Sequence, residues 1–208
     1  MVISFGPFRP LGSHPIMDPE QIFLFKLEDL RARCEQPPAA SDPREYTVLM
    51  AAPLLRDLLI SSPPLAHRVN RDHRLKLSFR CVPLESLTAK GLPEPEFHTA
   101  ALGFAMADLA APEFVQELPL EAFLGAPVAF LQGREISVRD LIDYVANAAG
   151  GVHFGSKDKR RRSTVDEFNN WVRLNGYQPA LYTLMAIGQV TVAALEPLAG
   201  AVRTELDA

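Results

Sequence analysis

The feature that most constrains the fold is a run of 22 residues, Leu174 to Leu195, that contains no charged side chain. Such a run is long enough to cross a membrane as a helix. It also contains an asparagine, two glutamines and a proline, and it begins in a turn-forming Asn-Gly pair. We therefore reject a membrane span and predict a helix from Pro179 that forms the buried centre of a domain, because a helix that is apolar on every side is typical of a core. A homo-oligomer held through the helix 180–195 is the alternative interpretation.

Two further helices are indicated near the N-terminus. The segment 18–20 (Asp-Pro-Glu) has the cap residue, proline and acid that helix starts favour, and apolar residues then recur as far as Cys34. A second helix is expected to begin at 41–42, where Ser and Asp precede a proline. We expect Pro53 to kink or split this second helix, and Ser61–Pro64 to end it.

A helix over 138–149 has clear start and stop signals. Ser137 and Asp140 form a Ser-x-x-Asp variant of the capping box, and the glycine pair 150–151 ends the helix. Apolar residues at about 100° per residue share one face: Val138, Leu141, Ile142, Val145 and Ala149. The polar face carries Asp140, Asp143, Tyr144 and Asn147. Another helix is expected to open at 163–164.

The strand signals are shorter. Residues 74–82 alternate between apolar and polar side chains, which is typical of a half-buried strand with a basic outer face. Residues 127–131 are expected to form a strand that is followed by a glycine turn and a second short strand. Residues 97–110 are ambiguous between strand and helix, and 118–125 suggest a short helix.

Together these elements predict an α+β fold, mainly helical, with a small antiparallel β-sheet. The sheet would contain 74–82 and 127–131, with 97–104 as a candidate third strand, and it would pack on the helices near 138–149 and 180–195.

Composition and cysteine content bound the class of protein. Hydrophobic residues make up 48% of the 208 residues, which is enough for a substantial core. Residues 1–16 hold several prolines and no long apolar run, so we expect an extended arm rather than a signal peptide, followed by a single globular domain over 17–208. Cys34 and Cys81 are too few for a disulfide framework and stand at apolar positions. They favour a reducing, cytoplasmic location and buried, unreactive thiols.

The candidate ligand site is the segment 144–164, which contains a double glycine, a histidine and a basic run. The glycines allow the backbone to approach a ligand closely, and His153 titrates near neutral pH. The bases stand directly before a predicted helix start, where they oppose the helix dipole unless an anion binds there. The expected ligand-binding residues are Asn147, Gly150, Gly151, His153, Lys157, Arg160, Arg161 and Arg162.

Three functions are compatible with this pattern, and we favour the first. It is a bacterial binding module whose loop 150–164 holds a phosphate-bearing ligand or nucleic acid. The second is an oligomeric scaffold or interaction subunit. The third is a hydrolase-type enzyme in which His153 acts with Asp140 or Asp143. A solvated loop between two helices is the plain structural alternative to all three.

The remaining sequence patterns argue against a metal or cofactor site and leave two interpretations of one basic segment. The five histidines lack metal-ligand spacing, and the chain has no nucleotide-binding glycine motif, so we expect neither a metal nor a cofactor. Residues 68–80 carry five bases and one acid. They form either a phosphate-contacting surface or a strand edge that charge protects from pairing.

The stretch ISVRDLIDYVANAAGGVHFG, residues 136–155, is similar to a family of uncharacterised bacterial proteins in which a short strand leads into a helix ending AN-x-x-GGVH. The preceding residues, LEAFLGAPVAFLQGRE, resemble the same family. The resemblance implies a bacterial, cytoplasmic protein and carries no known activity. It also implies that one local motif contains Asn147, Gly150, Gly151, Val152 and His153.

Overall fold

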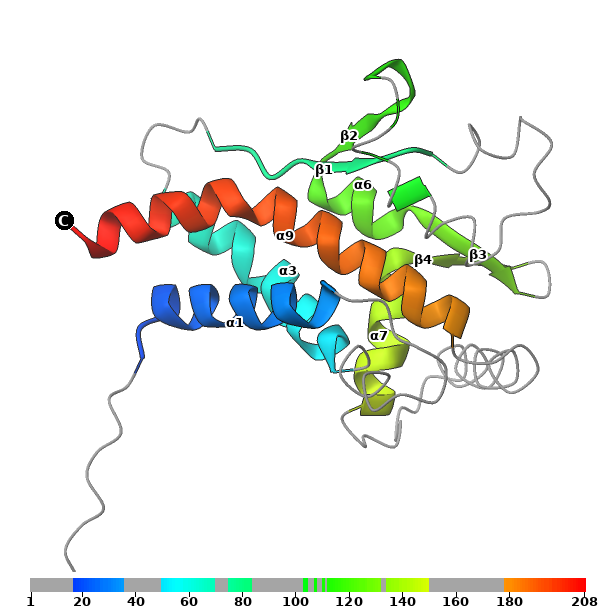
Figure 1. Cartoon of the computed structure of the whole chain (residues 1–208), viewed down its shortest axis with the longest axis horizontal. Helices are drawn as coiled ribbons and strands as arrows, with labels where there is room; N and C mark the ends of the chain where they lie inside the picture. Colours follow the sequence, from blue (N-terminus) through cyan, green and yellow to red (C-terminus); the bar gives the residue numbers. More distant parts are fainter. Residues whose placement is uncertain are drawn as a thin grey trace, which may run out of the picture.

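A computed structural model describes the chain over residues 17–35, 50–69, 75–83, 103–104, 107, 110, 112–131, 134–149 and 178–208. The described part is mainly helical, with two small antiparallel sheets, and so confirms the predicted α+β class (Figure 1). Its elements are α1 (Pro19–Cys34), α3 (Ala51–Val69), β1 (Phe79–Cys81), η1 (Pro112–Phe114), β2 (Gln116–Leu118), α6 (Leu120–Gly125), β3 (Pro127–Leu131), β4 (Arg134–Ser137), α7 (Val138–Ala149) and α9 (Gln178–Leu206).

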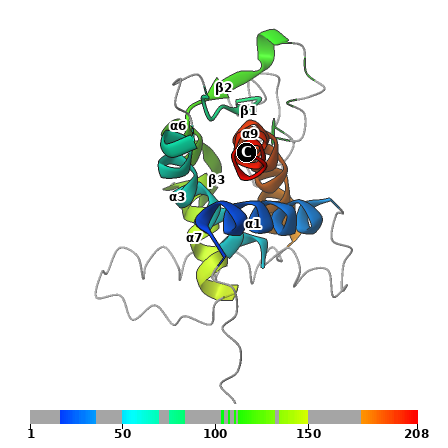
Figure 2. The ribbon, with the colours of Figure 1, turned by 90° about the vertical axis from the view of Figure 1, so that its left-hand side faces the viewer.

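The long C-terminal helix α9 forms the centre of the core, as its lack of charge predicted. It packs against α1, α3 and β1, and Figure 2 shows it lying between α1 and the β1–β2 sheet. The helix is long and apolar enough to span a membrane, yet much of its apolar surface is buried against other elements of this chain. It runs beyond the predicted end, through Pro197 to Leu206. Pro197 is exposed, while Leu198 and Val202 behind it are fully buried and hold the last turns on the core.

Helix α1 begins where its cap signals place it. Pro19 occupies the first turn, and the Asp18 backbone N–H donates to Gln21 Oε1 at 3.2 Å. The buried side chains of this helix recur at spacings of three or four residues: Phe23, Leu27, Leu30 and Cys34. Two ion pairs join α1 to α3, from Lys26 to Asp57 at 2.7 Å and from Arg68 to Glu20 at 2.5 Å.

Four charged side chains form an alternating cluster between α1 and α9, which we call the α1–α9 ion cluster. Arg31 contacts both Glu28, at 3.2 Å, and Glu196. Arg203 also contacts both acids, at 3.1 Å to Glu28 and 2.9 Å to Glu196. The Arg203 hydrogen bond, with the nearby Arg31, lowers the pKa of Glu196. A network of this kind constrains the two helices more than one exposed pair does.

The ion cluster predicts a loss of stability in acid. Because the folded-state pKa of Glu196 lies below its unfolded value, its contribution is fully present above the unfolded pKa and disappears as pH falls through the folded pKa. Since these side chains are about half exposed, we expect Glu196→Gln to cost about 0.5–1 kcal/mol at pH 6. Urea unfolding at pH 6 and pH 3 measures this. The cost should shrink at pH 3, and an equal cost at both pH values would contradict the assignment.

Helix α3 departs from the predicted boundaries. The prediction that Ser61–Pro64 ends the helix is wrong, because α3 continues to Val69. Pro63 and Pro64 are exposed, while Leu65 and Val69 beyond them are buried in the core, so tertiary packing offsets the lost backbone hydrogen bonds. Pro53 lies in the first turn of α3, where the N–H that proline lacks would have no partner within the helix. The predicted kink or split at Pro53 also involves the chain before residue 50, so it lies outside the described residues. The predicted start at 41–42 lies outside the described residues.

The strands form two sheets and not the single sheet predicted. β1 pairs with β2, a segment that was not predicted as a strand, and β3 pairs with β4. Of the described residues 75–82 of the predicted strand, only 79–81 are in the ladder, although the side chains alternate as expected there, with Phe79 and Cys81 buried and Arg80 exposed. Of 97–104, the structure describes 103–104 alone. Val82 N–H donates to Gly103 O at 3.0 Å, which places this segment beside the end of β1.

The two predicted strands pair with each other and are followed by the predicted helix, while the residues between the strands lie outside the described part. The β3–β4 hairpin leads directly into α7, and the Val138 N–H donates to Ala126 O at 2.9 Å, which ties the helix start to the end of α6. α7 packs against α3, and the hairpin contacts α7. In α6, Phe123 is fully buried and stacks on Phe79 of β1, with ring centroids 4.3 Å apart.

Helix α7 matches its predicted bounds and most of its predicted faces. Val138, Leu141, Ile142 and Val145 are buried, which confirms the apolar face over these four residues. Tyr144 was predicted on the polar face, and that is wrong: it is buried as well. The buried arc is wide because α7 is contacted by α3, α6, α9 and the β3–β4 hairpin together.

Candidate functional site

Three of the residues predicted to form a site lie in the described part of the chain, and all three are on α7: Asp140, Asp143 and Asn147. The remaining predicted residues lie outside the described residues: Gly150, Gly151, His153, Lys157, Arg160, Arg161 and Arg162. The convergence of His153 with an α7 carboxylate therefore stays a prediction.

Asp140 has a structural role at the start of α7. Its Oδ2 accepts hydrogen bonds from the Ser137 backbone N–H at 3.0 Å and from the Ser137 hydroxyl at 2.8 Å. The Ser137 Oγ in turn faces the Asp140 N–H at 3.2 Å, so the two residues form the reciprocal box that the sequence predicted. Asp140 is nine residues before the end of α7 at Ala149, or about 13 Å along the axis. These hydrogen bonds give Asp140 a structural role at the start of α7, so its presence does not require a catalytic role.

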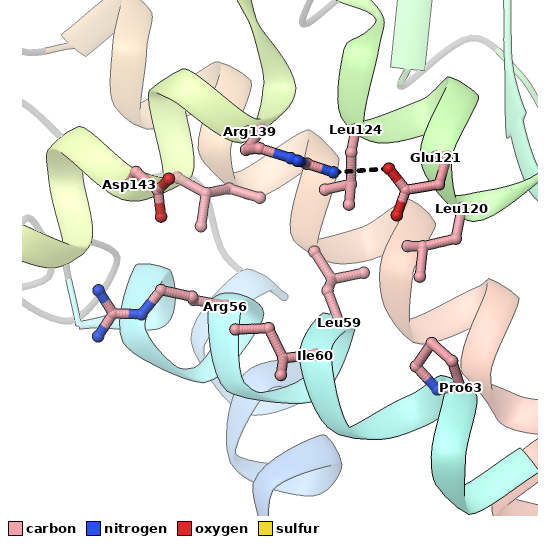
Figure 3. Close-up of a pocket in the computed structure, with 10 residues that line it drawn as sticks. Arg56, Leu59, Ile60, Pro63, Leu120, Glu121, Leu124, Arg139 and Asp143 are labelled. Atoms are coloured by element: carbon pink, nitrogen blue, oxygen red, sulfur yellow. Dashed lines mark hydrogen bonds and ion pairs between the residues drawn. The ribbon is translucent and has the colours of Figure 1, made fainter. Parts of the chain in front are cut away.

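Asp143 and Asn147 instead belong to a second face of α7, together with Arg139. These residues recur every four positions and so lie in a row along the helix. Asp143 and Asn147 are half-buried and Arg139 is exposed. Arg139 and Asp143 line a surface pocket between α3, α6 and α7 (Figure 3). The sequence singled out Asp143 and Asn147 and missed Arg139, which the four-residue spacing could have revealed.

The pocket has a volume of about 350 Å³, within the size range of small-molecule sites. We call it the α3–α6–α7 pocket. Its apolar lining comes from all three helices: Leu59, Ile60, Pro63, Leu120, Leu124 and Ile142. Ile60 is 69% exposed, so an apolar ligand would cover a side chain that now faces solvent. Four charged residues complete the lining: Arg56, Glu121, Arg139 and Asp143.

The charged side chains lie at two ends of the pocket (Figure 3). At one end, Arg139 Nη2 donates to Glu121 Oε2 at 2.8 Å. This pair is well exposed, at 54% and 81% of the two side chains, and such pairs contribute little to stability. At the other end lie Arg56, from α3, and Asp143, from α7.

Arg56 is the site residue that sequence analysis could not find. It precedes α7 by more than eighty residues and carries no local motif, so only the packing of α3 on α7 brings it to the pocket. Its Nη1 donates to the Asn147 amide oxygen at 3.4 Å, a long hydrogen bond. Asn147, predicted to bind a ligand, therefore contacts a guanidinium that can bind an anion.

Two other surface hollows are less informative. One lies between α1 and α3 and includes Ile22, Pro64 and Arg68. The other lies between the β1–β2 sheet and α6, and no charged residue lines it. Within the described residues, no group of three or more His, Cys, Asp or Glu side chains could hold a metal ion.

The two cysteines are buried, as predicted. Burial raises the pKa of the Cys34 thiol to about 12, against a smaller opposing effect of Arg33. Burial likewise raises the pKa of the Cys81 thiol to about 11. Because the thiolate is the reactive form, neither side chain is suited to act as a nucleophile.

No family model, curated protein or solved structure matches the chain. The resemblance of residues 120–155 to an uncharacterised bacterial family therefore stays a prediction.

Proposed function

We propose that this protein is a binding module that holds a small ligand with an apolar body and an oxyanion, either a phosphate or a carboxylate, in the α3–α6–α7 pocket. The apolar lining supports the first part of this proposal, because it comes from three helices and includes the exposed Ile60. Covering an apolar side chain of this size is worth about 1.5–3 kcal/mol when burial is complete.

The observation that carries the proposal is the position of Arg56. Its guanidinium lies at one end of a pocket with a largely apolar lining (Figure 3). Arg56 is half-buried, so water screens its charge less than that of a fully exposed arginine. Arginine has five N–H donors in a planar fork that matches a carboxylate or a phosphate. The 3.4 Å bond to Asn147 orients this fork and uses one of the donors.

The basic segment that the sequence indicated supports the same ligand class. α7 ends at Ala149, so the predicted phosphate-binding stretch follows Asn147 along the chain by only a few residues. Arg56 contacts α7 at Asn147, near this C-terminal end. A ligand anion at Arg56 would therefore bind beside Asn147, a residue that precedes His153 and the basic run by only a few positions in the sequence.

Isothermal titration with matched probes tests the proposal. Octyl phosphate carries both an apolar body and an oxyanion, octyl glucoside keeps the body without the charge, and inorganic phosphate keeps the charge without the body. We expect octyl phosphate, below its micelle concentration, to bind at least about tenfold more tightly than either control. Arg56→Ala should weaken octyl phosphate binding by about tenfold or more, since it removes a charge-assisted contact.

Arg68→Ala is the matched control, because it removes the same charge from the same helix outside the α3–α6–α7 pocket. Its affinity for octyl phosphate should stay within about twofold of wild type. Equal losses in Arg56→Ala and Arg68→Ala would mean that net charge alone attracts the probe. If octyl glucoside bound as tightly as octyl phosphate, the result would contradict the proposed recognition of an oxyanion. Binding of an oligonucleotide that Arg56→Ala leaves unchanged would favour a nucleic-acid surface elsewhere.

A further inference from the structure

We propose that the α3–α6–α7 pocket binds a medium-chain amphiphile, whose apolar body is about eight carbons long, and not a long-chain lipid. This inference rests on the proposed function and narrows its ligand class. It arises from the length of the apolar lining that leads away from Arg56, and from the groups that lie where this lining ends.

One stripe of α3 sets the length of the pocket. The α3 side chains that line it recur at spacings of three or four residues, which places them on one face of the helix: Arg56, Leu59, Ile60 and Pro63. Figure 3 shows Arg56 at one end of this stripe, Ile60 in the middle and Pro63 at the other end. From Arg56 to Pro63 the helix rises by about 10 Å, at about 1.5 Å per residue.

The apolar lining ends at Pro63 and Leu120. The next turn of the α3 stripe does not line the pocket. Arg139 and Glu121 lie at this end and pair with each other at 2.8 Å (Figure 3). A tail that continued past Leu120 would meet this exposed ion pair or water, and neither contact is favourable for a methylene group.

These limits set the length of the ligand body. An extended alkyl chain advances by about 1.25 Å per carbon–carbon bond, so a chain of about eight carbons spans the stripe of about 10 Å. Each methylene group up to this length leaves water for an apolar surface, and each further one stays in water. We therefore expect affinity to rise by about two- to fourfold per methylene as far as eight carbons, and to change little beyond that length.

Titration calorimetry with alkyl phosphates of four, six, eight, ten and twelve carbons, each below its micelle concentration, measures this length. Octyl phosphate should bind at least about tenfold more tightly than butyl phosphate. Dodecyl phosphate should bind within about threefold of octyl phosphate, because its last carbons find no apolar surface. Alkanoates of the same lengths repeat the series with the other oxyanion, and the break should fall at the same length.

Leu120→Gln assigns the break to the far end of the pocket. The polar amide removes the apolar contact for the end of an eight-carbon tail, whereas a four-carbon tail does not reach it. The variant should weaken octyl phosphate binding by about fivefold or more and leave butyl phosphate within about twofold of wild type. Leu206→Gln is the matched control, because Leu206 is 45% exposed on α9 and does not line the pocket. It should change neither affinity.

A second pair of variants applies if Leu120→Gln does not give a cooperative thermal transition. Pro63 is exposed at the same end of the pocket, and Pro63→Ala should weaken octyl phosphate binding by about twofold without an effect on butyl phosphate. Pro64→Ala is its control, because this neighbouring proline lines the hollow between α1 and α3 instead. It should leave both affinities unchanged.

The outcomes separate this inference from the proposed function. An affinity that depends on Arg56 but keeps rising to dodecyl phosphate would overturn the medium-chain ligand and leave the anionic amphiphile intact. Equal losses of octyl and butyl phosphate binding in Leu120→Gln would also overturn the inference, because the tail would then not lie along the stripe. If no alkyl phosphate binds better than inorganic phosphate, both proposals fall together.

Discussion

Replacing Leu184 with aspartate is expected to abolish the native fold. Leu184 is a fully buried residue of α9. Helices α1 and α3 and strand β1 all pack against α9. Truncating a buried leucine alone costs about 2–5 kcal/mol. Placing a carboxylate in the same space adds several kcal/mol more, because the described core contains no cation beside it to compensate. The sum reaches the whole stability of a typical domain, about 5–15 kcal/mol.

Circular dichroism with urea denaturation measures this effect. Leu184→Asp should show no cooperative transition, or should be recovered only as aggregate. Ala193→Asp is the control, because it adds the same charge to an exposed position of the same helix, and it should change the free energy of unfolding by about 0.5 kcal/mol or less. A cooperative transition in Leu184→Asp close to that of wild type would show that α9 is not the centre of the core.

Gly188→Ala is expected to destabilise the protein although alanine favours helices. Gly188 lies where α9 crosses the C-terminal end of α1, and a Cβ there would stand 2.3 Å from the Cys34 Sγ. Atoms cannot approach so closely, so either the buried Cys34 Sγ must leave its position or the helices must separate, and overpacking of this kind costs about 1–3 kcal/mol. The helix propensity of alanine returns about 1 kcal/mol at most. If the helices separate, the hydrogen bond that Gln189 donates to Cys34 O at 2.8 Å would also be lost.

Two further variants make the Gly188 prediction specific. Cys34→Ala removes the sulfur and leaves the Cys34 Cβ at 3.4 Å from the new methyl group, so the double variant should recover most of the stability lost in Gly188→Ala. Gly200→Ala, on the same helix, has no atom within 4 Å of its added Cβ and should stabilise by up to about 1 kcal/mol. A Cys34→Ala change that gives no recovery in a double-mutant cycle would locate the strain elsewhere.

Local sequence signals identified most of the elements correctly. The capping residues of α1 and α7, the short apolar pattern of α6 and the apolar strand segments of β3 and β4 are all signals that span only a few residues. These helices and strands form where predicted. Pairing could not be predicted in the same way. β2 has the sequence Gln-Glu-Leu and is largely exposed, so it shows no alternation, and its pairing with β1 depends on contacts between distant segments.

Errors in α3 and α7 have a similar cause. The prolines at 63–64 are strong local signals for a helix end, but the buried Leu65 and Val69 hold α3 beyond them. The helical periodicity of α7 places Tyr144 on the polar side, but the neighbouring elements bury this side chain. In both places tertiary packing outweighs a correct local preference.

The candidate site was predictable only in part. Asp143 and Asn147 followed from the periodicity of α7, and both lie at or beside the α3–α6–α7 pocket. Arg56 gave no signal, because an isolated arginine on an amphipathic helix is usually a solvated side chain. Its significance comes only from the fold, which places it opposite Asp143 and in contact with Asn147.

The contact between α1 and α9 has a consequence for synthesis on the ribosome. Cys34 and Gly188, like Arg31 and Glu196, meet across more than 150 residues of chain. The nascent polypeptide must therefore wait until α9 emerges from the exit tunnel before it can cover the apolar faces of α1 and α3. During translation these faces are the surfaces that a chaperone would meet first.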